Sequence, residues 1–262
     1  MEFLLAGNYA HYVLMLSTLI LLMGAAFLGK RIGKRRQAQD LPVDDELKIV
    51  LGAILSLFGL LVGFTFSFAI NGYQARIQAE ENEAIAIGNA FQRISVLEEK
   101  YQPRAESMLQ DYLALRIHFF ETTDETNRAE TRMAAIQLQT HMWKLISQLA
   151  QQNPNAVMVT ALNASNELYT AQQKTMSSWQ RQVPGAAWIL LLFFAVCSNF
   201  LLGHNIRGIH GNNTIIMLLP ALISLALLMI SEIDSPGAGL IYVTPENLNA
   251  LRHTLEVGGL AP

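Results

Sequence analysis

The sequence is short of the residues on which many soluble proteins depend. One cysteine, Cys197, occurs among 262 residues and lies in an apolar run, so neither a disulfide framework nor a cysteine metal site is expected. Charged residues make up 15% and hydrophobic residues 52%, whereas soluble domains carry about 25% charged residues. The net charge of −3 is too close to neutral to favour nucleic acid as a partner. The shortage of charge points to a lipid bilayer.

Signatures of chemistry are also missing. There is no phosphate-binding glycine loop, no Gly-x-Ser-x-Gly motif and no carboxylate pair within an apolar run, so we do not expect an enzyme. No two histidines have the spacing of a helical ligand pair, and we expect neither a metal nor a cofactor. Strand-like alternation and internal repeats are absent as well. The sequence therefore predicts an all-α fold.

Four apolar stretches are long enough to cross a membrane. A spanning helix needs about 20 mostly apolar residues, and the candidates are Ala10–Leu28, Ile49–Ile70, Pro184–Gly203 and Thr214–Ile230. The first has no basic segment before it and a basic cluster after it, which is typical of a retained span rather than a signal peptide. We predict four transmembrane helices in segments 1–70 and 184–232, with a C-terminal tail over 233–262.

The distribution of basic residues predicts the orientation. The loop between the first two spans holds six of the 18 lysines and arginines, and the loop between the last two adds Arg207. The opposite side has three, namely Arg76, Arg181 and Arg252. Cytoplasmic loops are enriched in basic residues. Both termini and the large insert are therefore predicted to lie outside the cytoplasm.

The insert between the second and third spans, residues 71–183, has helical periodicity throughout. No glycine or proline interrupts Tyr73–Ile87, which predicts that the second span continues out of the membrane as one long helix. Pro103 and Pro154 mark breaks, because proline blocks the preceding helical turn. The expected structure is a helical bundle.

Small residues form a stripe along the second span. Ser56, Gly59 and Gly63 share one helix face, and such stripes let helices approach closely in a bilayer. Leu60, Phe64 and Phe68 step by four residues beside them. One interpretation is helix packing with lipid-facing phenylalanines. The other is a pore-lining helix whose bulky side chains form stacked apolar rings, which can gate by dewetting.

Charged residues follow directly on the same long helix. Arg76, Glu80 and Glu83 would form charged rings at a pore mouth if the chain assembles symmetrically. The plainer expectation for these three side chains is solvated helix surface.

The run from Leu61 to Arg76 resembles the second membrane helix of bestrophins. More closely, the chain resembles the bestrophin-like domain family of bacteria and plants, through Glu83–Arg93 and again in Asp234–Gly239 and Thr244–Glu246. The resemblance implies a homopentameric channel for small ions, with anions favoured, in a bacterial inner membrane. It places the neck at Ser56, Leu60 and Phe64. Because Ser56 is polar, we expect the constriction at Leu60, Phe64 and Phe68.

A second class of function stays open. A helical insert between two spans is also a common way to build a sensor or interaction protein that is anchored in the membrane and has no pore. A pore predicts that Leu60, Phe64 and Phe68 face a symmetry axis. A sensor predicts that they face lipid or other helices of the same subunit, and that the bundle contains a pocket.

Overall fold

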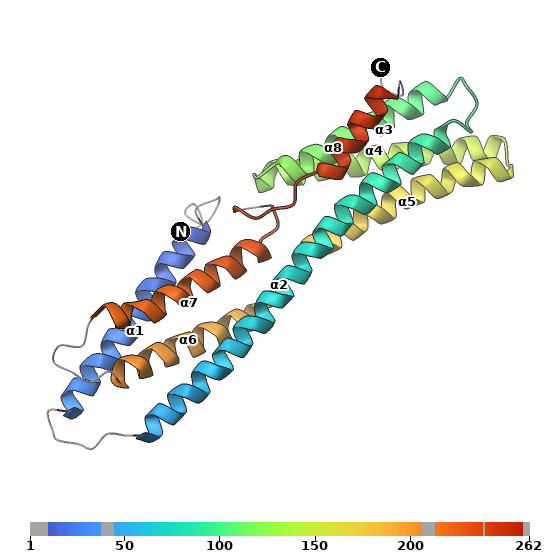
Figure 1. Ribbon diagram of the computed structural model, residues 1–262. Coiled ribbons are helices and arrows are strands. Elements are labelled where there is room, and N and C mark those ends of the chain that lie inside the picture. Colours follow the sequence, from blue (N-terminus) through green and yellow to red (C-terminus); the bar gives the residue numbers. More distant parts are fainter. Residues whose placement is uncertain (1–9, 38–44, 206–212, 238, 259–262) are drawn as a thin grey trace. The chain divides into compact units, whose positions relative to one another are not determined.

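The computed structural model describes residues 10–37, 45–205, 213–237 and 239–258, which contain eight helices and no strand (Figure 1). The all-α prediction is confirmed. The helices are α1 (Ala10–Gln37), α2 (Asp45–Ile94), α3 (Gln102–Glu121), α4 (Glu125–Gln152), α5 (Ala156–Trp179), α6 (Gly185–Asn205), α7 (Asn213–Asp234) and α8 (Glu246–Val257).

The chain divides into two compact units. The first, called the membrane unit, consists of Met1–Asn71 and Gln182–Ile241. The second, called the bundle unit, consists of Gly72–Arg181 and Tyr242–Pro262. The segment after the fourth span is divided between the two units. Residues up to Ile241 belong to the membrane unit, whereas α8 groups with the inserted helices rather than forming a separate tail.

Helices α1, α2, α6 and α7 are each long and apolar enough to cross a membrane. These are the helices in which the four predicted spans lie. The α2 helix runs for 50 residues without interruption, as the absence of glycine and proline in Tyr73–Ile87 predicts. The insertion of a helical bundle between the second and third spans is also found as predicted.

The membrane unit is held together by α1, which packs most extensively on α6 and next on α7. Its core consists of Leu22, Phe58, Leu191, Ala195, Ile223 and Leu227. The crossing of α1 and α6 is close enough for backbone contact. A Cβ atom at Gly29 would collide with the carbonyl oxygen of Phe200, and one at Gly203 with that of Ala26. Close approach of this kind increases dispersion contact where lipid removes any hydrophobic drive.

The bundle unit has helix ends that match the local sequence. A proline opens the first turn of α3, where its missing N–H costs nothing. The side chains of Asp124 and Asn155 cap α4 and α5 by accepting from the backbone N–H groups of Asn127 at 3.1 Å and Met158 at 2.8 Å. The core includes Ile87, Leu109, Tyr112, Ile117, Phe120, Ala135, Leu168 and Leu248.

Candidate functional site

The membrane half of α2 has two different faces. One face is buried in the membrane unit and consists of Leu51, Phe58, Thr65 and Ala69. The opposite face carries Leu60, Phe64 and Phe68, whose exposed fractions are 54%, 65% and 47%. The three side chains proposed for a constriction therefore do not contribute to the core of their own subunit.

The small residues beside them are also without neighbours. A Cβ atom added at Gly52, Gly59 or Gly63 would meet nothing within 4 Å, and Ser56 is exposed. This stripe therefore does not mediate packing within the subunit. The glycines that do so, Gly29 and Gly203, lie on α1 and α6, where no motif in the sequence marked them.

The three residues predicted as pore-mouth charges are buried rather than exposed. Arg76, Glu80 and Glu83 are exposed by 1%, 1% and 0%, so the expectation of solvated helix surface is wrong. A charged ring at a pore mouth requires side chains that reach solvent, and in this conformation these three are enclosed by their own subunit. Arg76 directs Nη1 toward the carbonyl oxygen of Arg181 at 3.5 Å. The other two belong to separate hydrogen-bond networks in the bundle unit.

Glu83 forms a buried ion pair with Arg116 of α3. Arg116 donates from Nε to Oε1 at 2.5 Å and from Nη2 to Oε2 at 3.1 Å, and both side chains are fully buried. The same carboxylate accepts from the hydroxyl groups of Thr175 at 2.8 Å and Tyr112 at 3.3 Å. Four donors thus satisfy both oxygens, which offsets much of the cost of removing the charge from water.

The ion pair shifts the ionisation of its neighbours. Burial raises the pKa of the Tyr112 hydroxyl well above its ordinary value, and the negative charge of Glu83 raises this pKa further. Burial alone would lower the pKa of Arg116, but Glu83 and Tyr112 together outweigh burial and hold that pKa above its ordinary value. Arg116 also lies over the ring of Phe119, 4.4 Å from its centroid. The network therefore keeps a full ion pair inside the bundle.

The sequence contained a weak signal for this network. Arg116 follows Leu109, Tyr112 and Leu113 at helical spacing, so a charged residue stands on an otherwise apolar face of α3. Its partner on α2 could not be identified, because contacts between distant segments depend on how the helices pack.

Glu80 provides the missing cap of α8. The residue at the cap position, Pro245, makes no side-chain cap bond. Glu80 instead accepts from the backbone N–H of Leu248 at 2.9 Å and from the side-chain amide of Asn247 at 2.6 Å. A carboxylate at a helix N-terminus is favoured by the helix dipole. Glu80 thereby attaches α8 to α2 within the bundle unit.

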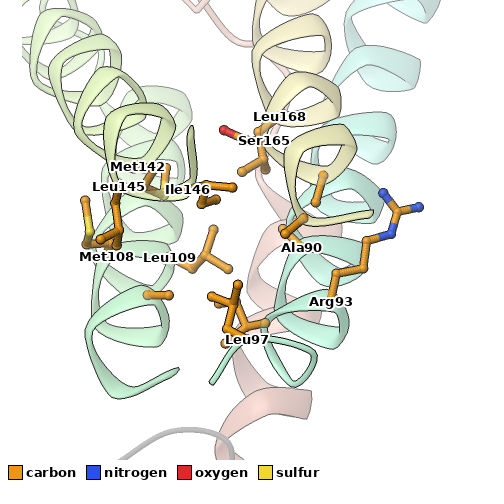
Figure 2. A pocket seen from close by; sticks show the side chains of 14 residues that line it. Ala90, Arg93, Leu97, Met108, Leu109, Met142, Leu145, Ile146, Ser165 and Leu168 are labelled. Atoms are coloured by element: carbon orange, nitrogen blue, oxygen red, sulfur yellow. The ribbon is translucent and has the colours of Figure 1, made fainter. Parts of the chain in front are cut away.

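A small apolar cavity lies inside the bundle (Figure 2). Its lining includes Ala90, Leu109, Met142 and Leu168, contributed by α2, α3, α4 and α5. Arg93 stands at its edge and points its guanidinium group away from the cavity. The volume is about 30 Å³, enough for one or two water molecules by size. The lining is almost entirely apolar, so the cavity offers few groups that could bind a polar ligand.

The end of α7 contains two buried carboxylates. Asp234 accepts from the backbone N–H of Val183 at 2.8 Å, and Glu232 accepts from the backbone N–H of Leu240 at 2.6 Å. Gly239 has φ +91°, and a Cβ atom there would collide with the carboxylate of Glu232. Both acids therefore hold the turn that follows the fourth span. Within the described ranges, no three His, Cys, Asp or Glu side chains gather closely enough to hold a metal ion.

Comparisons with known proteins agree on the fold. A crystal structure of a bacterial bestrophin homolog from Klebsiella pneumoniae, phased by Zn-SAD, aligns with a TM-score of 0.67 at 15% identity and covers 94% of this chain and 99% of that chain. A point variant of the Klebsiella homolog aligns with a TM-score of 0.66 at 16% identity, covering 94% and 97%. A crystal structure described as a membrane protein aligns with a TM-score of 0.69 at 15% identity, covering 95% and 100%.

These likenesses show a shared fold at low sequence identity. A search of curated protein sequences found no match. The model of the bestrophin-like domain, by contrast, matches residues 12–248, which is most of the chain and includes all four membrane helices. The chain therefore belongs to the bestrophin-like family.

Proposed function

We propose that the chain is a bestrophin-type ion channel in which a ring of copies, a pentamer by family resemblance, surrounds a pore lined by α2. The supporting observation is the face of α2 that carries Leu60, Phe64 and Phe68, because these three side chains are exposed in their own subunit. The three side chains form the narrowest part of the pore, and ions pass it by losing part of their hydration shell. Apolar constrictions of this kind gate by dewetting.

Exposure alone does not separate a pore face from a lipid face. Ile189 and Phe193 on α6 are 73% and 59% exposed, as expected for side chains that contact lipid tails. The difference is that the exposed face of α2 includes Gly59, Gly63 and Ser56. Small and polar residues gain little from lipid, whereas they allow helices of neighbouring subunits to approach closely around an axis. The composition of this face therefore favours subunit contact and a pore.

The constriction itself carries no fixed charge. The family resemblance favours anions, and the positive edges of the Phe64 and Phe68 rings would suit them. These partial charges are small, so the sign of the conducted ion depends on charged groups on either side of the neck.

The first test is to record currents from purified protein in planar bilayers. Phe64→Ala should enlarge the conductance of discrete wild-type currents or alter their selectivity, because it widens the apolar ring. Phe193→Ala is the matched control, since it removes an equally exposed phenylalanine from α6, and its currents should equal those of wild type. Silence from wild type and both variants, in protein shown to be folded and oligomeric, would contradict the channel.

The bundle unit gives less support to the sensor alternative than the exposed face of α2 gives to the channel. Its interior cavity of about 30 Å³ is too small for an organic ligand. A larger hollow of about 290 Å³ lies between α4 and α5, but its lining includes the exposed Trp143 and Tyr169, so it belongs to the surface. Neither of these two hollows is an enclosed cavity large enough for such a ligand.

A further inference from the structure

The surface hollow of about 290 Å³ between α4 and α5 lies entirely within the bundle unit. Gln139 and Trp143 line it from α4, and Ser165 and Tyr169 line it from α5. The members of each pair are four positions apart, so they share one face of their helix. Because the hollow belongs to one unit of one chain, its properties do not depend on whether copies of the chain form a pore.

The lining of this hollow is aromatic and uncharged. Trp143 is 46% exposed and Tyr169 is 54% exposed, so both side chains are open to solvent and can stack on a flat molecule. Thr140 and Asn166 add a hydroxyl group and an amide group. None of the described residues that line the hollow carries a charge at neutral pH. The lining therefore suits an uncharged ring with polar edges, and it offers no partner for a phosphate or carboxylate group.

Gln139 is a buried polar residue of the lining, with an exposed fraction of 7%. Its side-chain amide donates from Nε2 to the hydroxyl oxygen of Tyr112 at 2.9 Å. Tyr112 donates its only hydroxyl proton to Glu83 at 3.3 Å, so the Tyr112 oxygen can only accept from Gln139. The amide of Gln139 is thereby oriented, with its N–H toward Tyr112 and its carbonyl oxygen left over.

This carbonyl oxygen of Gln139 lacks a donor. Oε1 has no hydrogen-bond partner among the residues that the structure describes. Buried polar atoms in proteins nearly always have a partner, and Gln139 is part of the wall of the hollow. An N–H group on a molecule bound in the hollow supplies the missing donor. The matching ligand is therefore a flat ring that also carries an N–H.

We propose that the hollow between α4 and α5 binds an uncharged heterocycle of the nucleobase type, which stacks on Trp143 and Tyr169 and donates an N–H to Oε1 of Gln139. Aromatic side chains stack on the faces of bases, and side-chain hydrogen bonds recognise their edges. The volume of the hollow is at the lower end of small-molecule pockets. Because the hollow is open to solvent, the ligand rests against its walls and is not enclosed.

The first test compares two ligands by equilibrium dialysis against the full-length protein in detergent. Radiolabelled uracil is uncharged and carries two ring N–H donors. Uracil methylated at both ring nitrogens keeps the same ring but has no donor. Wild type should bind uracil about five- to tenfold more tightly than the methylated analogue, which is the difference expected for one hydrogen bond.

Three variants locate the site. Trp143→Leu should weaken uracil binding about tenfold, because it removes a stacking surface. Met133→Leu is the matched control: Met133 is 51% exposed on the same helix but does not line the hollow, so uracil affinity should equal that of wild type. Gln139→Met removes the acceptor and should bind uracil and the methylated analogue equally. If circular dichroism shows Gln139→Met to be unfolded, the two ligands on wild type still test the hydrogen bond.

The outcomes decide the ligand class and the place of binding. Equal affinity of wild type for uracil and the methylated analogue would overturn the hydrogen bond to Gln139. Binding of choline or maltose without binding of uracil would overturn the ligand class. No uracil binding by folded wild type, or equal effects of Trp143→Leu and Met133→Leu, would overturn the site. Dialysis detects binding whether or not the protein conducts ions, so each of these results leaves the channel proposal in place.

Discussion

At the scale of single residues, burial decides which role each charged side chain of the bundle unit has. Glu81 and Glu83 are two positions apart on α2, yet one is exposed and the other has an exposed fraction of 0%. Residues two positions apart on a helix point in different directions. Only Glu83 faces α3 and its Arg116, so one carboxylate stabilises the bundle and the other stays at the surface.

Removing the buried carboxylate should destabilise the protein strongly. Glu83→Gln leaves Arg116 as an uncompensated buried charge, and breaking such a pair costs about 3–5 kcal/mol. The free energy of unfolding, followed by circular dichroism in denaturant, should fall by this amount. Glu98→Gln is the matched control, because Glu98 pairs with Lys100 through side chains that are 55% and 63% exposed, and exposed pairs contribute about 0.2–1 kcal/mol.

A double variant distinguishes the ion pair from simple loss of packing. Combining Glu83→Gln with Arg116→Met removes both charges, so it should recover part of the stability lost in the single variant. Equal losses for Glu83→Gln and Glu98→Gln, or a double variant less stable than Glu83→Gln alone, would show that the buried charge is not the source of the effect.

At the scale of helices, glycine has opposite roles on different elements. On α1 and α6, Gly29 and Gly203 bring two backbones into contact. On α2, Gly59 and Gly63 face open space within the subunit. The sequence pattern is similar in both places. A stripe of small residues indicates close approach to another helix, but it does not show which helix that is.

This difference predicts how substitutions at glycine affect folding. Gly203→Val would force the valine side chain into the backbone of α1 beside Ala26, and overpacking of a rigid contact should cost about 3 kcal/mol or more. Gly24→Val is the control, since a Cβ atom at Gly24 meets nothing within 4 Å. Thermal unfolding in detergent should show a clear loss of stability for Gly203→Val only. Similar unfolding temperatures for the two variants would disprove the close crossing.

At the scale of the whole molecule, the exposed face of α2 connects the structure of one subunit with the proposed assembly of several. Side chains of 54% and 65% exposure at Leu60 and Phe64 are compatible with a folded subunit, because the core of the membrane unit is built from other positions. Burial of this face therefore has to come from lipid or from other copies. The proposed ring assigns it to other copies and to the pore.

The small residues of this face provide a direct test of assembly. A Cβ atom added at Gly63 meets nothing within 4 Å in its own subunit, so Gly63→Leu should change the free energy of unfolding of the isolated subunit by less than about 0.5 kcal/mol. The bulky side chain should instead alter the oligomeric state, measured by light scattering, or sharply reduce the current. A destabilised subunit with an unchanged oligomer and unchanged current would indicate that Gly63 packs within the chain and not between copies.

The sequence by itself determined the features that depend on local pattern. The apolar runs predicted the four membrane helices, since a helix satisfies its backbone hydrogen bonds in lipid within a single segment. Proline and polar residues marked the breaks between helices in the bundle, and the short motifs around Gly63 and Pro245 indicated the family. The long α2 followed from the absence of glycine and proline in Tyr73–Ile87.

Only the tertiary structure decided which face of each helix is used. Helical periodicity shows that Glu80, Glu81 and Glu83 point in different directions, but not which direction meets another helix. The structure buries Glu83 against Arg116, joins Glu80 to α8 and leaves Glu81 exposed. It also moves the close glycine contact from α2 to α1 and α6. The physical reason is that burial, ion pairing and backbone contact arise between segments far apart in sequence, whose meeting no local pattern encodes.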